Sequence, residues 1–244
     1  MTEKEKMLRG MLYAPARDET LLAELAACKA QCQQFNQRAY QAEGIESAQM
    51  LLRRLLGAAG EGLRIEPPFW CDYGWNISVG RNFYMNHGGV ILDAGGVTFG
   101  DNVLVGPQCG FYTSGHPLDA AKRAQGLEYA YPIRVGSGVW IGGGVRVMPG
   151  VSIGDGAVIA SGSVVTKDIP AGVLAAGVPC RPIRVGSDVW IGAGVQVMPG
   201  VTIGDGSVIA GGSVVTRDIP AGVLAAGVPC RPIRPITEAD RTLP

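Results

Sequence analysis

The chain has 244 residues, 47% of them hydrophobic, and its 21 basic and 21 acidic residues cancel to a net charge of zero. This balance argues against nucleic acid and anionic membranes as partners, and no apolar run approaches the roughly 18 residues of a membrane span. The charged opening MTEKEKMLRG does not resemble a signal peptide, so we expect a cytoplasmic protein. The 37 glycines follow no Gly-X-Y period and indicate many tight turns.

Two amphipathic helices are predicted near the N-terminus. Apolar residues step by three and four from residue 18 to 37 and again from 48 to 56, and the following EPPFW stops the helix. Cys28 and Cys32 lie in the first apolar stripe and are expected in the core. The six cysteines lack C-x-x-C spacing, so we expect them to be reduced and structural, at positions 28, 32, 71, 109, 180 and 230.

Beyond Ile77 the sequence repeats with a period of six, less regularly from Val79 to Cys109. Later hexads open with an aliphatic residue, at positions 135, 141, 147, 153, 159 and 165, and place a small or aliphatic residue fifth. Each hexad makes a short strand and a turn, and three hexads close a coil of about 18 residues, stacked at about 4.8 Å. The pattern predicts a mainly β fold, a left-handed parallel β-helix. A β-sandwich would show period-two alternation instead.

The hexads stop for residues 113–132, a segment too long to be a coil corner. It is expected to project from the coils and carries His116, one of two histidines in the chain. Imidazole is the side chain best suited to take a proton from a hydroxyl near neutral pH. The residues alone leave a solvated surface histidine as the alternative, and Asp119 or Glu128 as groups that orient the ring.

The C-terminal part of the chain is a duplication. Residues 134–183 recur as residues 184–233 with seven differences in fifty positions. We expect the second copy to add coils to the same helix, displaced by roughly 14 Å at the strand spacing.

Several motifs resemble the maltose and galactoside O-acetyltransferases of the hexapeptide-repeat superfamily. They are EKEKMLRGMLY, CDYGWNISVGRNFYMN, YTSGHPLD, VWIGGGVRVMPGVSIGDGAVIASGSVVTKDIP and AAGVPCRPIR, in order from about residue 3 to 184. The resemblance implies a homotrimer of β-helices in which acetyl-CoA and a sugar acceptor meet between neighbouring subunits. It also implies that no metal takes part.

The resemblance assigns roles to individual residues. His116 is the general base and Asn86 an active-site polar contact. Asp72 and Tyr84 match positions of the acceptor pocket, with simple packing as the alternative for Tyr84. Asp93 is expected either to contact the acceptor or to close a turn. The family's coenzyme A positions map to Gly143, Ser161, Thr166, Lys167, Arg181 and Arg184. A basic side chain there would meet the phosphates.

The predicted organisation is a helical segment (1–60), a β-helix (61–183), duplicated coils (184–233) and a tail (234–244). The predicted activity is acetyl-CoA-dependent O-acetylation of a sugar hydroxyl. A catalytically silent trimeric scaffold and an acetyltransferase for a non-sugar acceptor are the alternatives. A β-helix enzyme of the γ-carbonic-anhydrase type needs three histidines for its metal, and this chain has two.

Overall fold

The structure is a computed structural model that describes residues 1–41 and 44–241. The chain divides into two compact units, Met1–Gly172 and Val173–Pro244. The last three residues of the predicted tail lie outside the described part. Within that part, no helix combines the length and hydropathy that a membrane span requires.

Four short or medium helices open the first unit: α1 (Glu3–Leu8), the 3-10 helix η1 (Pro15–Arg17), α2 (Glu19–Arg38) and α3 (Gly44–Leu55). The helix α2 begins where the Asp18 side chain accepts a hydrogen bond from the Leu21 backbone N–H at 3.1 Å. Both predicted amphipathic helices are therefore confirmed. The helix α1 was missed because six residues are too few to display a helical period.

Three parallel sheets form the coils of the first unit. The first sheet holds β1 (Ala58–Ala59), β4 (Ile77–Val79), β7 (Val97–Phe99), β12 (Ile133–Val135) and β15 (Ser152–Ile153). The second holds β2 (Arg64–Ile65), β5 (Tyr84–Met85), β8 (Leu104–Val105), β13 (Trp140–Ile141) and β16 (Val158–Ile159). The third holds β3 (Phe69–Cys71), β6 (Gly89–Leu92), β9 (Gly110–Tyr112), β14 (Arg146–Val147) and β17 (Val164–Val165). Successive strands along the chain go to different sheets, so the fold is the expected β-helix of stacked parallel coils.

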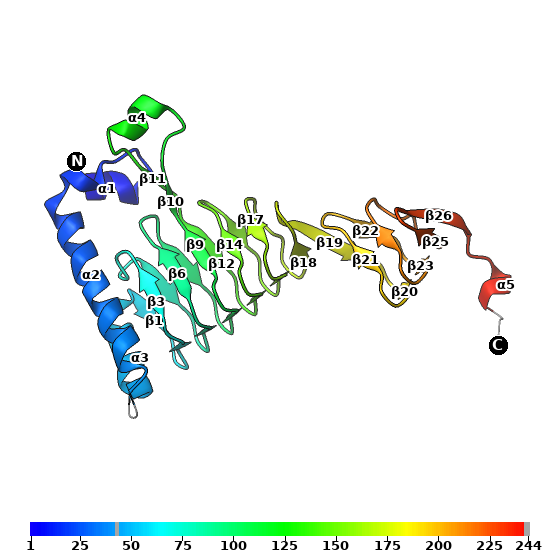
Figure 1. Cartoon of the computed structure of the whole chain (residues 1–244), viewed down its shortest axis with the longest axis horizontal. Helices are drawn as coiled ribbons and strands as arrows, with labels where there is room; N and C mark the ends of the chain where they lie inside the picture. Colours follow the sequence, from blue (N-terminus) through cyan, green and yellow to red (C-terminus); the bar gives the residue numbers. More distant parts are fainter. Residues whose placement is uncertain (42–43, 242–244) are drawn as a thin grey trace. The chain divides into compact units, whose positions relative to one another are not determined.

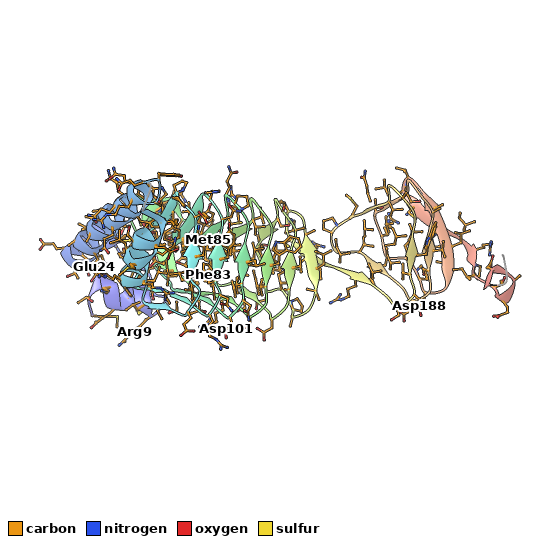
Figure 2. The ribbon with its side chains drawn as sticks, turned by 90° about the horizontal axis from the view of Figure 1, so that it is seen from below. Arg9, Glu24, Phe83, Met85, Asp101 and Asp188 are labelled. Carbon is orange, nitrogen blue, oxygen red and sulfur yellow. The ribbon has the colours of Figure 1, made fainter. Side chains whose placement is uncertain are left out.

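The interior of the coils is filled by the residues that the hexads predicted. The first and fifth positions of the six hexads from Val135 to Ile169 are at most 4% exposed. Phe83, Phe99 and Phe111 stack along the interior with ring centroids 4.8 and 5.0 Å apart. Figure 2 shows Phe83 and Met85 inside the coils and Asp101 at their edge. Burial of these side chains supplies most of the driving force for folding.

The early hexads are less regular because the early coils are longer. The register pairs Ile65 with Met85 and Met85 with Val105, twenty residues apart in each step. Ile141 pairs with Ile159, eighteen residues apart. Two additional residues per coil break the period of six without disturbing the stacking.

The excursion at residues 113–132 leaves the coils as expected. It contains β10 (Ser114–Gly115), α4 (Ala120–Ala124) and β11 (Tyr129–Ala130), and β10 and β11 pair in an antiparallel ladder. Figure 1 shows α4 standing out from the coils, whereas α2 and α3 lie alongside the first of them.

The second unit contains its own coils and ends in a hairpin. Its strands are β18 (Leu174–Ala176), β19 (Arg181–Val185), β20 (Trp190–Ile191), β21 (Gln196–Val197), β22 (Thr202–Ile203), β23 (Val208–Ile209), β24 (Val214–Val215), β25 (Val223–Gly227) and β26 (Cys230–Pro235), followed by α5 (Glu238–Arg241). The strands β25 and β26 pair in an antiparallel hairpin. Val201, Ile203, Ile209 and Val215 belong to a separate core.

The two copies of the duplicated segment differ in burial despite their near identity. Val135 and Ile141 are 4% and 0% exposed, whereas their equivalents Val185 and Ile191 are 50% and 41% exposed. In the described part of the second unit, β20 and β21 each pair with a single strand.

Candidate functional site

A cavity of about 360 Å³ lies at the base of the projecting segment. His116 lines it together with Asp72, Glu128 and Tyr13. These residues come from the excursion, from the corner after β3 and from the N-terminal segment. The cavity therefore exists only because three distant parts of the chain meet.

The backbone of the excursion fixes the imidazole of His116. The ring lies directly after β10, and its Nδ1 is 3.2 Å from the carbonyl oxygen of Leu127. A carbonyl only accepts hydrogen bonds, so Nδ1 donates in this contact, and in the neutral tautomer that the contact favours Nε2 has no proton. His116 is exposed, and its free nitrogen can accept a proton from a bound molecule.

Neither carboxylate proposed to orient His116 takes that role. Glu128 accepts a hydrogen bond from the hydroxyl of Tyr13 at 2.9 Å, and Asp119 caps α4 by accepting from the Lys122 backbone N–H at 2.8 Å. Tyr13 and Glu128 also exchange two backbone hydrogen bonds, of 3.0 and 2.8 Å. Burial raises the pKa of Tyr13, so its hydroxyl stays a donor. These bonds tie the N-terminal segment to the excursion.

Asp72 is the partly buried acid of the cavity. Desolvation by burial, followed by the nearby charge of Asp93, raises the pKa of Asp72 to about 6. Such a shift is typical of functional sites, where an acidic group is held away from water.

Asp93 lies beneath Asp72 and supports it. The side chain of Asp93 is fully buried, and its Oδ1 accepts hydrogen bonds from the backbone N–H groups of Asp72 and Tyr73, both at 2.9 Å. Its Oδ2 is buried without a hydrogen-bond partner among the described residues, and burial raises the pKa of this carboxyl. Of the two roles considered for Asp93, this position corresponds to closing the turn that presents Asp72.

Asn86 and Tyr84 lie away from the His116 cavity. Tyr84 is on the outer face of β5, between Arg64 and Leu104 of the neighbouring strands. Asn86 follows β5, and its side-chain oxygen accepts a hydrogen bond from the His87 backbone N–H at 2.7 Å. Its side-chain nitrogen donates to no group within residues 1–41 and 44–241 and is free to contact a ligand.

The predicted residues of the first unit gather along two edges of the β-helix. We call the corners that follow the second sheet the Asn86 edge: Gly143 and Ser161 occupy it in successive coils, and the Gly143 carbonyl accepts from the Gly162 N–H at 2.8 Å. We call the corners that follow the third sheet the His116 edge: Asp72, the excursion with His116, and the exposed Thr166 and Lys167 lie there. Arg181 and Arg184 belong to the second unit and are exposed.

The chain matches two family patterns. The pattern described as "Maltose acetyltransferase hexapeptide capping motif" covers residues 6–60, and "Bacterial transferase hexapeptide (six repeats)" matches residues 132–167 and again 182–217. The chain is 49% identical to a putative acetyltransferase of Saccharomyces cerevisiae, over 72% of this chain and 89% of that protein.

Solved structures of acetyltransferases are also similar to this chain. A maltose O-acetyltransferase from Clostridium difficile 630 is 46% identical with a TM-score of 0.72, covering 75% of this chain and 96% of its own. The chain belongs to the hexapeptide-repeat acetyltransferases. A galactoside acetyltransferase solved in complex with coenzyme A is 41% identical with a TM-score of 0.72, covering 75% of this chain and 90% of its own. The resemblance inferred from the sequence motifs and the predicted class of enzyme are thereby confirmed.

Sequence reasoning missed the N-terminal wall of the cavity and the group that orients His116. No sequence pattern around Tyr13 or Leu127 predicts a site. Tyr13 contributes through a long-range bridge to Glu128, and Leu127 contributes through its backbone carbonyl. A hydrogen bond to a main-chain carbonyl is independent of residue type, so no sequence signal points to it.

Proposed function

We propose that the chain is an acetyl-CoA-dependent O-acetyltransferase that acts on a hydroxyl of a sugar. The observation that carries the proposal is the contact of His116 Nδ1 with the Leu127 carbonyl oxygen, at a cavity that also presents a carboxyl group, Asp72. The complex of the similar galactoside acetyltransferase with coenzyme A supports the donor. A cytoplasmic location stays a prediction.

His116 acts as the general base in this proposal. Its Nε2 accepts the proton of the acceptor hydroxyl while the hydroxyl oxygen attacks the thioester carbonyl carbon of acetyl-CoA. The tetrahedral intermediate then collapses, the carbon–sulfur bond breaks, and the proton passes from the imidazolium to the departing thiolate. The products are the acetyl ester and the thiol of coenzyme A, and His116 returns to its neutral form.

Asp72 binds the acceptor. A carboxylate in a partly desolvated cavity is a strong acceptor for sugar hydroxyl groups. Asp93 positions Asp72 through the two backbone N–H groups that it holds. Tyr84 lies on a different face and would contact the acceptor only from another subunit.

The site is completed by a second copy of the chain. His116 and Asn86 lie on different edges of the first unit, so one chain does not present both to one substrate. The outer face of the second sheet carries a stripe of apolar side chains, in which Leu104 and Trp140 are neighbours and are 50% and 56% exposed. Exposed apolar patches of this kind mark protein interfaces, which supports the homotrimer.

Acetyl-CoA would lie along the Asn86 edge of one subunit, facing the His116 edge of its neighbour. Gly143 and Ser161 present backbone and small side chains there, so a pantetheine arm can lie flat. Thr166 and Lys167, on the His116 edge of the neighbouring subunit, are the proposed contacts of the phosphate end. The family resemblance also assigns phosphate contacts to Arg181 and Arg184, which belong to the second unit. A Lys or Arg side chain pairs well with phosphate.

The test is release of coenzyme A thiol from acetyl-CoA with a panel of sugars and simple alcohols. We expect turnover with at least one sugar, and a loss of about 10²-fold or more in kcat in His116→Ala with unchanged affinity for coenzyme A. Near-normal turnover in His116→Ala would refute the role of this residue. No turnover with any sugar, together with turnover of another alcohol, would refute the acceptor class.

A further inference from the structure

Three buried cysteines form a cluster between the N-terminal helices and the coils. Cys28 and Cys32 lie one turn apart on α2, and Cys71 ends β3. The Sγ atom of Cys71 is 3.5 Å from that of Cys28 and 3.7 Å from that of Cys32, and all three sulfur atoms lie within 4.8 Å of one another. The three residues are at most 2% exposed and are not joined by disulfides. The sequence suggested only a core position for two of them.

The spacing of the three sulfur atoms is close to that of a metal site. A thiolate–metal bond of about 2.3 Å places the sulfur atoms of a planar three-coordinate ion about 4.0 Å apart. The two measured separations are therefore a few tenths of an ångström short of this value. Small side-chain rotations would widen the cluster enough for one ion.

The cluster is held in place from both sides. The side chain of Asn36, two turns along α2 from Cys28, accepts the backbone N–H of Phe69 at 2.8 Å and donates to the Phe69 carbonyl at 3.1 Å. This pair of hydrogen bonds fixes α2 against β3. Because helix and strand are tied together, the three thiols are organised before any ligand arrives, which lowers the entropy cost of binding.

The chemistry of the cluster selects a soft ion of low coordination number. Thiolate sulfur favours Cu(I), zinc and iron–sulfur clusters. A structural zinc site is almost always four-coordinate, and among the described residues no fourth histidine, cysteine or carboxylate belongs to this group.

A cavity adjoins the cluster at Cys71. This residue lines a cavity of about 320 Å³ together with Lys29, Trp70 and Asp72. Asp72 also lines the His116 cavity. An ion on Cys71 would therefore be bound one residue away from the proposed acceptor contact, without touching the reacting atoms.

We propose that Cys28, Cys32 and Cys71 form a three-coordinate site for Cu(I). The ion replaces the protons of the thiols that ligate it, and these protons leave to solvent. Neither copper nor sulfur changes oxidation state in this step. The site is separate from acetyl transfer and would link α2 covalently, through the metal, to the first coils.

The experiment is an anaerobic titration of the full-length chain with Cu(I) held by a coloured chelator such as bicinchoninate. We expect one Cu(I) per chain, with three sulfur neighbours at about 2.3 Å by X-ray absorption. Cys28→Ser, Cys32→Ser and Cys71→Ser should each weaken Cu(I) binding by at least about 100-fold, since each removes a ligand. Cys109→Ser is the matched control, because Cys109 is equally buried but lies outside the cluster. It should bind Cu(I) as the unmodified chain does.

A second measurement needs no substitution and so does not depend on the variants folding. The chain is unfolded in the presence of an alkylating agent, with and without Cu(I), and the modified cysteines are mapped by mass spectrometry. Cu(I) should protect Cys28, Cys32 and Cys71 from alkylation but leave Cys109 unprotected. Failure to take Cu(I) from the chelator, equal protection of Cys109, or a two-sulfur coordination shell would each overturn the proposal.

Discussion

Replacing Asp72 with Asn is expected to stabilise the protein, and increasingly so as the pH rises. Burial and the charge of Asp93 raise the pKa of Asp72 from 3.8 to about 6, so ionisation of this side chain opposes folding. A raised carboxyl pKa leaves stability intact below about pH 4 and lowers it as the pH rises to about 6, above which the loss is complete. The cost to the free energy of folding comes from burying the ionised carboxylate. Asn has no ionisable group, so the variant does not incur this cost.

The magnitude follows from the size of the shift. Each pKa unit corresponds to about 1.4 kcal/mol, and discounting the partial exposure of the side chain leaves roughly 2 kcal/mol at pH 8. The backbone N–H of Asp72, which Asp93 holds, is unaffected by the substitution. The gain should therefore not be offset by a lost turn.

Urea denaturation at pH 4.5, 6 and 8 and at a fixed protein concentration measures this effect. The difference in unfolding free energy between Asp72→Asn and the unmodified chain should grow with pH. Glu61→Gln, at an exposed carboxylate of the same unit, is the control and should show no such trend. An Asp72→Asn chain that is less stable at pH 8, or whose gain is the same at all three values, would refute the account of Asp72 as a desolvated acid.

Two further predictions concern the duplicated coils and the turns. Lys167→Ala should raise the KM for acetyl-CoA, whereas Arg217→Ala, its equivalent in the second copy, should leave it unchanged; the reverse result would assign coenzyme A to the second copy. Gly162→Ala should lower the unfolding free energy by about 1 kcal/mol, because Gly162 has a φ of +73° that alanine adopts only with strain. No atom lies within 4 Å of an added Cβ, so the cost comes from the backbone conformation alone. Chemical denaturation that shows no loss would contradict this reading of the turn.

The sequence predicted the coils better than the site, and the reason is physical. A hexad places the same residue type inward in every coil. The regular recurrence of aliphatic residues such as Val135 and Ile141 therefore predicts stacked coils. The excursion was likewise visible as a gap in that repetition. Tyr13 with Glu128, and Cys71 with the two cysteines of α2, meet only through tertiary folding, so no local pattern contained them.

The duplication shows a second limit of sequence reasoning. Val185 and Ile191 repeat the residues at 135 and 141, yet they are about half exposed. Burial of a hexad residue depends on a neighbouring coil as well as on its own side chain. Identical sequence therefore predicts an identical coil, but not an identical environment.

Subunit complementation tests the central claim, a site shared between two copies of the chain, most directly. His116→Ala and Asn86→Ala, each of low activity alone, are co-refolded in equal amounts and assayed for thiol release from acetyl-CoA. If each site takes His116 from one subunit and Asn86 from its neighbour, about a quarter of the sites in randomly mixed oligomers combine two intact residues. Recovery of about a quarter of the unmodified activity is therefore expected. Activity that stays at the level of the separate variants, in oligomers shown by mass spectrometry to contain both chains, would contradict it.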